Sequence, residues 1–196
     1  MDIHINKKNT DHYIFMLHGT GGNSQDLRGI AEFIDPDATL IGVDGSEFEN
    51  GMRRYFKRYP DGTFDLDNLK ENTDILHQVI TQVIEDNNAK SSKITAFGYS
   101  NGANILSNLM KEYESLPIDN VILFHPSSAR EEVAFKKNKA KVFMTSGLHD
   151  PFVTQEEFMN MKQSFENSGI VTEIYTHDAG HGLIHEELEL AKKFVL

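Results

Sequence analysis

The stretch Ile94–Gly102, which reads ITAFGYSNG, holds the pattern that decides the fold of this chain. Its first four residues form a short apolar run typical of a buried strand, and a helix-like spacing of apolar residues begins at Leu106. Glycines two positions before and after Ser100 let the chain turn sharply from strand to helix without steric clash. Such a turn would hold the Ser100 hydroxyl clear of the sheet, at a helix N-terminus that favours developing negative charge. Ser100 is therefore a candidate nucleophile; the alternative is a chance pattern in which it only caps the helix.

Similar apolar runs recur on both sides of this stretch and alternate with segments of helical periodicity. Runs of about five apolar residues suit strands buried on both faces of a parallel sheet. Strands that alternate with helices predict an α/β fold with a doubly wound, mostly parallel sheet of about six to seven strands. The other predicted strands are Tyr13–Leu17, Thr39–Val43, Asn120–Phe124, Lys141–Thr145 and Val171–Tyr175, with a short edge strand around Ile3 and Ile5; the helical segments are Leu69–Ile84, Leu106–Met110, Phe158–Phe165 and Leu183–Phe194.

The length of 196 residues fits a single domain, residues 1–196. No linker, repeat or low-complexity segment divides the chain. The gap between Pro126 and Lys139 is too short for a cap domain, so we expect an open site.

A serine nucleophile needs a base, and the base needs a carboxylate that orients it. After a strand–serine–helix turn of this kind, the order along the chain is Ser, Asp or Glu, His. Asp150 and His181 each follow a predicted strand, and the carboxyl ends of strands are where an open α/β sheet gathers its ligands. We predict that His181 takes the proton of Ser100 and that Asp150 orients His181. The competing residues are His149, His177 and His185 as bases and Asp178 as the acid.

A glycine-rich segment, His18-Gly19-Thr20-Gly21-Gly22-Asn23, directly follows the first long predicted strand. Acyl transfer needs two backbone N–H donors aimed at the developing oxyanion, and a turn of this kind supplies one of them. We assign the two donors to the N–H groups of Thr20 and Asn101. His18 is expected to support the turn by hydrogen bonding. A phosphate-binding loop is the competing interpretation, but neither of its glycine patterns is present.

Four basic residues form a cluster in a chain that is otherwise acidic: Arg53, Arg54, Lys57 and Arg58. The cluster lies in the irregular segment Asp44–Asp65, and loops of that length are usually functional. An arginine there could meet an anionic part of a substrate, or the cluster could simply pair with nearby acids. The candidate substrate-binding residues are His18, Gly19, Arg53, Arg54, Tyr55 and Phe56.

The composition restricts the possible partners and the compartment. Nineteen basic and 30 acidic residues give a net charge of −11, which argues against nucleic acid and anionic membranes as partners. Cysteine is absent, which excludes disulfides and thiolate chemistry. The N-terminal ten residues are polar, and no apolar run approaches the roughly 20 residues that span a bilayer. We expect no membrane insertion and a cytoplasmic location.

Taken together, the spacing of His-Gly-x-Gly-Gly, Gly-x-Ser-x-Gly, Gly-x-x-Asp-Pro and Gly-His-x-Leu resembles the phospholipase/carboxylesterase family of α/β-hydrolases. That family includes dienelactone-hydrolase-like and acyl-protein-thioesterase-like enzymes. The resemblance covers nearly the whole chain, and residues 51–58 with Phe64 and Asp65 are similar to a loop of a bacterial carboxylesterase branch, some members of which are linked to quinone stress. It implies an esterase that uses no metal or cofactor and is often a homodimer.

One departure from the family pattern bears on the substrate. Thioesterase relatives usually carry Ser-Gln-Gly-Gly at the nucleophile, whereas this chain has Ser100-Asn101-Gly102-Ala103. We therefore expect a carboxylesterase that acts on small-molecule esters through an acyl-Ser100 intermediate. The alternatives are a thioesterase or lysophospholipase of the same family, transfer of the acyl group to an acceptor other than water, or a non-catalytic binding protein with the hydrolase fold.

Overall fold

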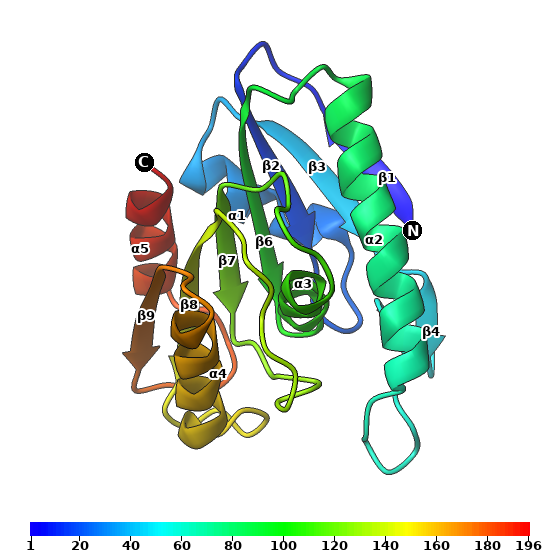
Figure 1. Cartoon of the computed structure of the whole chain (residues 1–196), viewed down its shortest axis with the longest axis vertical. Coiled ribbons are helices and arrows are strands. Elements are labelled where there is room, and N and C mark those ends of the chain that lie inside the picture. Colours follow the sequence, from blue (N-terminus) through cyan, green and yellow to red (C-terminus); the bar gives the residue numbers. More distant parts are fainter.

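A seven-stranded sheet forms the centre of the molecule (Figure 1) in a computed structural model that describes residues Met1 to Leu196. The strand order is β1-β3-β2-β6-β7-β8-β9, and every neighbouring pair is parallel except β1 with β3. The α/β prediction with a doubly wound, mostly parallel sheet is confirmed. The strands are β1 (Asp2–Asn6), β2 (His12–Leu17), β3 (Thr39–Asp44), β6 (Lys93–Tyr99), β7 (Asn120–Phe124), β8 (Lys141–Gly147) and β9 (Thr172–His177).

Helices cover both faces of the sheet because side chains on successive strand residues point to opposite faces. On one face, Phe15 and Leu17 belong to the larger apolar core together with residues of α2, α3 and α4. On the other face, Ile14 and Met16 pack with residues of α1 and α5. The helices are α1 (Arg28–Ile34), α2 (Leu66–Asp86), α3 (Asn101–Glu112), α4 (Gln155–Asn167) and α5 (His185–Val195), with a short 3₁₀ helix, η1 (Ser24–Leu27), before α1. The last helix begins two residues later than the apolar spacing from Leu183 predicts.

The segment Asp44–Asp65, expected to be irregular, contains a small two-stranded antiparallel hairpin of β4 (Glu47–Glu49) and β5 (Met52–Arg54). The hairpin was missed because each strand is only three residues long and rich in charge. The segment between β7 and β8 contains no helix or strand, in line with the predicted lack of a cap. None of the helices has the length and apolar character needed to cross a membrane.

Successive strands are added to opposite sides of the sheet from β2 and from β6, so the topological switch point lies between these two strands. From β2 the chain proceeds to β3 on one side, and from β6 it proceeds to β7 on the other. In open α/β sheets, ligands bind outside the carboxyl ends of the strands at this switch point. The turns that carry Thr20 and Ser100 follow β2 and β6 respectively, so both lie at the switch point.

Two glycines allow the sharp turn after β6 and its packing against the end of β2. A Cβ atom added to Gly102 would lie 2.2 Å from the carbonyl oxygen of Leu17, and one added to Gly98 would lie 2.4 Å from the backbone carbon of Gly102. Because backbone atoms cannot move aside as a flexible side chain can, only glycine fits at either position.

Replacing Gly102 with alanine is therefore expected to destabilise the protein by about 1–3 kcal/mol or more, the usual cost of overpacking. Gly29→Ala is the matched control, because Gly29 is exposed in α1 and has no atom within 4 Å of the added Cβ. That change should stabilise the fold by about 0.5–1 kcal/mol. Chemical denaturation of both variants measures the difference, and equal stability would contradict the packing argument.

Candidate active site

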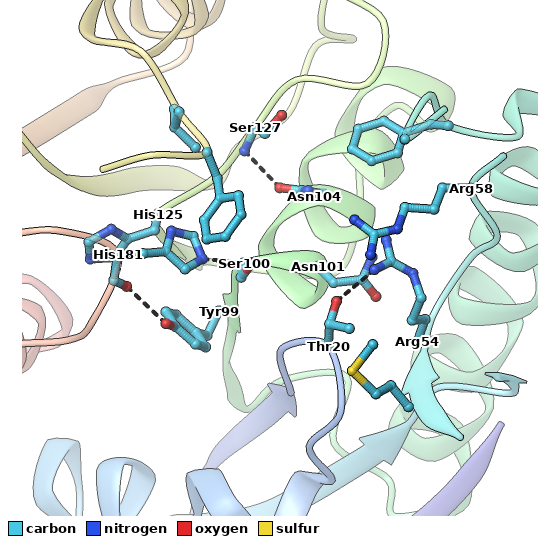
Figure 2. A pocket seen from close by; sticks show the side chains of 15 residues that line it. Thr20, Arg54, Arg58, Tyr99, Ser100, Asn101, Asn104, His125, Ser127 and His181 are labelled. Carbon is cyan, nitrogen blue, oxygen red and sulfur yellow. Dashed lines mark hydrogen bonds between the residues drawn. The ribbon is translucent and has the colours of Figure 1, made fainter. Parts of the chain in front are cut away.

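Ser100 occupies the sharp turn between β6 and α3. Its backbone has φ 51° and ψ −113°, in the left-handed region of φ that non-glycine residues rarely adopt. Two backbone hydrogen bonds hold this conformation: Ser100 N–H donates to the carbonyl of Phe124 (2.9 Å), and Asn104 N–H donates to the carbonyl of Ser100 (2.9 Å). The strained turn places the Ser100 side chain on the wall of a cavity (Figure 2).

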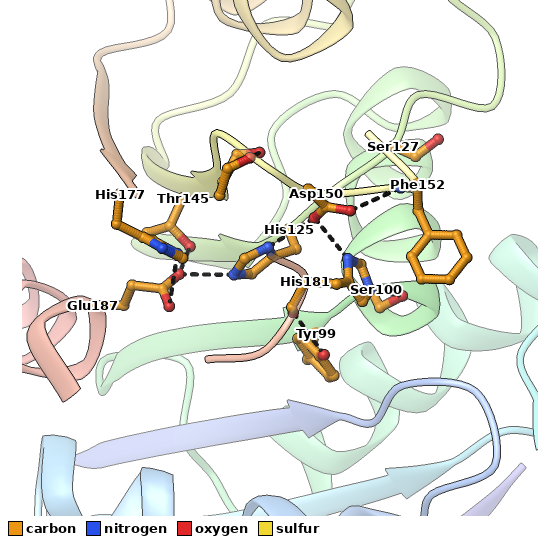
Figure 3. Close-up of polar contacts among 12 residues, drawn as sticks. Tyr99, Ser100, His125, Ser127, Thr145, Asp150, Phe152, His177, His181 and Glu187 are labelled. Carbon is orange, nitrogen blue, oxygen red and sulfur yellow. Dashed lines mark hydrogen bonds and ion pairs between the residues drawn. The ribbon is translucent and has the colours of Figure 1, made fainter. Parts of the chain in front are cut away.

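Ser100, His181 and Asp150 form a continuous hydrogen-bonded series (Figure 3). The Ser100 Oγ lies 2.9 Å from His181 Nε2, and His181 Nδ1 lies 2.7 Å from Asp150 Oδ2. With the imidazole proton on Nδ1, the serine hydroxyl donates to Nε2 and Nδ1 donates to the carboxylate. The Asp150 side chain has no solvent exposure, whereas 18% of the His181 side chain is exposed.

The loops that carry Asp150 and His181 are hydrogen-bonded to each other and to β6. His149 N–H donates to the carbonyl of Ala179 (3.0 Å), which joins the loop after β8 to the loop after β9. The Tyr99 hydroxyl donates to the carbonyl of His181 (2.8 Å). A Cβ atom added to Gly147 would lie 2.2 Å from a backbone oxygen of the second loop, so the two loops are in direct contact.

Hydrogen bonds keep the Asp150 carboxyl ionised in spite of its burial. Burial by itself favours the neutral acid, but donors from His181, the backbone N–H of Phe152 (2.9 Å) and His125 outweigh it and lower the pKa of Asp150. An ionised carboxylate is the acceptor that fixes the Nδ1-protonated form of His181.

Sequence reasoning missed His125 and Glu187, which lie buried behind Asp150. His125 Nδ1 donates to Asp150 Oδ2 (2.9 Å), and its Nε2 lies 3.0 Å from Glu187 Oε1. His125 directly follows the strand β7, so the rule that selected Asp150 and His181 also applies to it. Glu187 lies in the first turn of α5, where the sequence offers no comparable signal.

The two predicted oxyanion donors border the same cavity as Ser100. Thr20 and Asn101 both line it, and neither backbone N–H donates a hydrogen bond within the protein. The turn after β2 is fixed by the N–H of Gly21, which donates to the carbonyl of Arg53 (2.8 Å), and by Arg54 Nη1, which donates to Thr20 Oγ1 (2.8 Å).

His18 supports this turn through hydrogen bonds to the backbone. Its Nδ1 donates to the carbonyl of Gly19 (2.7 Å), and its Nε2 accepts from the N–H of Gly45 (3.0 Å). Burial lowers the pKa of His18, so the ring stays neutral and can accept at Nε2. His18 is thus bonded to the backbone on both sides of the ring, as expected for a supporting residue.

The cavity beside Ser100 has a volume of about 510 Å³. One wall carries Arg54, which is buried, and Arg58, whose Nε donates to both oxygens of Glu49 (2.9 and 2.8 Å). Glu49 also lies 3.4 Å from Arg54, so one carboxylate faces two guanidinium groups. The other lining residues are Thr20, Met52, Gly62, Phe64, Tyr99, Ser100, Asn101, Asn104, His125, Ser127, Phe152, Val153 and His181.

Of the six residues predicted to bind substrate, only Arg54 lines this cavity. His18, Gly19, Arg53, Tyr55 and Phe56 lie outside its lining. Tyr55 and Phe56 have no solvent exposure and belong to the core. Arg53 instead donates to the carbonyl of Gly45 (3.0 Å). Alternation in the extended segment explains this difference, because neighbouring side chains point in opposite directions.

The competing acids and bases lie elsewhere. His149 and Asp178 form an exposed pair 2.8 Å apart, and His185 is an exposed residue of α5. His177 is buried, with its Nε2 3.3 Å from Glu187 Oε2.

Two groups of side chains have the spacing of metal ligands: His125 with His177 and Glu187, and His125 with Asp150 and His181. In both groups the histidines lie within ion-pair distance of the carboxylates, although His125 Nε2 and both ring nitrogens of His177 have no hydrogen-bond partner. We assign no metal to either group.

A parallel sheet with a serine at the turn after β6, hydrogen-bonded to a histidine and an aspartate from later loops, defines an α/β-hydrolase. Residues 54–193 match the dienelactone hydrolase family, and the chain belongs to that family. It is a hydrolase of the dienelactone-hydrolase and carboxylesterase type.

Individual relatives agree with this assignment over almost the whole chain. "Putative hydrolase MhqD" of Bacillus subtilis (strain 168) is 38% identical over 193 residues, which cover 97% of this chain and 96% of the relative. The crystal structure of the Bacillus cereus carboxylesterase has a TM-score of 0.92 and 32% identity, with 100% and 93% of the two chains covered. The structure of YahD with malic acid has a TM-score of 0.89 and 32% identity, with 99% and 97% covered.

Tyr55→Phe tests whether this residue acts on substrate or on structure. The Tyr55 hydroxyl accepts from the N–H of His18 (2.9 Å) and donates to the carbonyl of Val43, so its removal takes one hydrogen-bond partner from each of two buried backbone groups. We expect a loss of about 1–3 kcal/mol in the free energy of unfolding, with KM for an ester unchanged. A rise in KM at unchanged stability would instead point to substrate contact.

Proposed function

We propose that the protein is a serine carboxylesterase that hydrolyses small esters through an acyl-Ser100 intermediate. The observation that carries this proposal is the series Ser100–His181–Asp150 beside two unpaired backbone N–H groups. A nucleophile, a base, an orienting carboxylate and an oxyanion hole are the four parts that acyl transfer requires.

The reaction follows from the roles of these groups. His181 Nε2 removes the proton of Ser100 as Oγ attacks the ester carbonyl carbon. The negative charge that develops on the carbonyl oxygen is stabilised by the N–H groups of Thr20 and Asn101, the proposed oxyanion hole. His181 then gives its proton to the departing alcohol oxygen, which leaves the acyl group on Ser100. In the second half, water gives a proton to His181 as it attacks the acyl carbon. The bond between the acyl carbon and Ser100 Oγ then breaks, and His181 returns the proton to Oγ, which releases the acid and restores the hydroxyl.

The size and lining of the cavity support a small ester as the substrate. A volume of about 510 Å³ lies within the usual range for small-molecule sites. Met52, Phe64, Phe152 and Val153 supply apolar wall, which suits an acyl chain or an aromatic leaving group. Asn101, where thioesterase relatives usually carry glutamine, favours an ester over a lipidated protein.

Ser100→Ala is expected to reduce the hydrolysis of p-nitrophenyl esters by about 10⁴-fold or more, because the mutant has no nucleophile. Ser127→Ala is the matched control, since Ser127 lines the same cavity and its hydroxyl makes no hydrogen bond to Ser100 or His181. A panel of esters of rising chain length gives kcat and KM for each variant.

Two outcomes would contradict the proposal in different ways. Activity of Ser100→Ala equal to wild type would exclude Ser100 as the nucleophile. Fluorophosphonate labelling that requires Ser100, without turnover of any ester or thioester, would favour a binding protein.

The cavity wall that carries Arg54 and Arg58 indicates the charge of the preferred substrate. Arg54 and Arg58 share the single carboxylate of Glu49, so this wall carries an excess of one positive charge. Both arginines line the cavity beside Ser100. We infer that the preferred ester carries an anionic group, which these guanidinium groups would meet.

Arg58→Ala should raise KM for an ester with a carboxylate by about 10-fold, in the range of a charged hydrogen bond, and leave KM for a neutral ester of equal size nearly unchanged. Arg53→Ala is the control, because Arg53 is close in sequence but lies outside the cavity lining. Equal effects of Arg58→Ala on both esters would remove the idea of charge recognition.

A further inference from the structure

His125 lies at the centre of a series of ion-paired and hydrogen-bonded side chains that runs from Glu187 to Ser100 (Figure 3). Its Nδ1 is 2.9 Å from Asp150 Oδ2, and its Nε2 is 3.0 Å from Glu187 Oε1. None of these three side chains has any solvent exposure. The imidazole therefore lies between two carboxylates, and none of the three side chains has surface exposed to solvent.

Two hydrogen bonds hold the Glu187 carboxylate. It accepts from the Thr145 hydroxyl and from the backbone N–H of Ile184 (2.7 Å). His125 Nε2 and His177 Nε2 lie within ion-pair distance of the carboxylate, at 3.0 and 3.3 Å, without the geometry of a hydrogen bond. The two hydrogen bonds make Glu187 a rigid support for the His125 ring.

The charges of this group balance in favour of a cationic His125. Burial favours the neutral ring, but the carboxylates of Glu187 and Asp150 outweigh it and raise the pKa of His125. The same contacts lower the pKa of Glu187 against its own burial. These contacts favour a protonated His125 between the carboxylates of Glu187 and Asp150.

Asp150 Oδ2 is the shared atom, because it accepts from both His125 and His181. A second donor on the same oxygen restricts rotation of the carboxylate. We propose that His125 and Glu187 are positioning residues that hold Asp150 ionised and aimed at His181. This inference rests on the proposed serine mechanism and extends the series Ser100–His181–Asp150 by two residues into the protein.

The backbone of His125 supports a dedicated role. Its φ is 51°, in the left-handed region, directly after β7. Strain of this kind persists where surrounding structure over-determines it, and such residues cluster at active sites. A buried ion pair is also an expensive way to fill a core, since apolar residues of similar volume often stabilise more.

The groups that face His125 come from every neighbouring element. Asp150 follows β8, Glu187 belongs to α5, and the ring centroid of His181 is 5.2 Å away. The rings of Tyr99 on β6 and His177 on β9 lie at 6.1 and 5.4 Å. Of these, only His125 contacts both Asp150 and Glu187.

His125→Gln removes the cation while it keeps an amide donor of similar reach. We expect kcat to fall by about 10- to 100-fold, as for other residues that orient a catalytic group, with KM nearly unchanged. Loss of a positive charge beside the Asp150–His181 pair makes protonation of that pair easier. The acid limb of the kcat/KM profile should therefore move to higher pH, on the order of one unit.

A double-mutant cycle tests whether His125 and Glu187 act together. It adds Glu187→Gln and the double variant His125→Gln/Glu187→Gln to the single variant His125→Gln. Glu187→Gln removes the charge that keeps His125 cationic and should give a smaller loss of kcat, because His125 can still donate to Asp150. The double variant removes one charge of each sign. It should be no worse than His125→Gln alone, since Glu187 is no longer left buried with fewer partners.

His12→Gln is the control for the loss of a buried histidine. His12 is buried and hydrogen-bonded to Asp35 (2.6 Å) and Thr95 (2.9 Å), but it lies at the amino end of β2, away from the active site. It should lower thermal stability without changing kcat or the pH profile of the folded enzyme.

The outcomes separate this proposal from the proposed function. If wild type neither hydrolyses esters nor reacts with a fluorophosphonate at Ser100, the serine mechanism itself is excluded. If wild type is active and His125→Gln, shown to be folded by circular dichroism, keeps the wild-type kcat and acid limb, the positioning role is excluded. A loss of kcat without movement of the acid limb, matched by His12→Gln, would reduce His125 to a structural residue.

Discussion

The close approach of two backbones at the switch point is the constraint on which the rest of the active site depends. The turn after β6 packs against the end of β2 with no room for a Cβ atom at Gly102, and the turn itself leaves no room for one at Gly98. The contact with β2 brings Ser100 next to the turn that carries Thr20, although the two residues are far apart in the sequence. It also explains why Ser100 has a strained backbone: the chain must reverse at once from strand to helix.

Much of the fold could be predicted from the sequence because the sheet is parallel and buried. Strands covered on both faces appear as apolar runs, and the predicted run Asn120–Phe124 coincides with β7. The β4–β5 hairpin could not be found in this way, because strands of three residues at the surface have neither an apolar run nor a clear alternation.

The candidate site was predictable to the extent that its residues follow strands. Ser100, Asp150 and His181 could be chosen because each comes after a recognisable strand in the order that the chemistry needs. Glu187 could not, because a glutamate in the first turn of a helix is also what the helix dipole alone would favour. The pocket residues were the least predictable, since whether Arg53 or Arg54 faces the cavity depends on a one-residue register in the hairpin.

The position of Glu187 and His181 along the chain has a consequence for folding. His181 lies 81 residues after Ser100, and Glu187 belongs to the last helix. A chain in which β9 and α5 are not docked would hold Ser100 without His181 and Asp150 without the support proposed for Glu187. The reactivity of Ser100 therefore reports that these two elements are docked on the sheet.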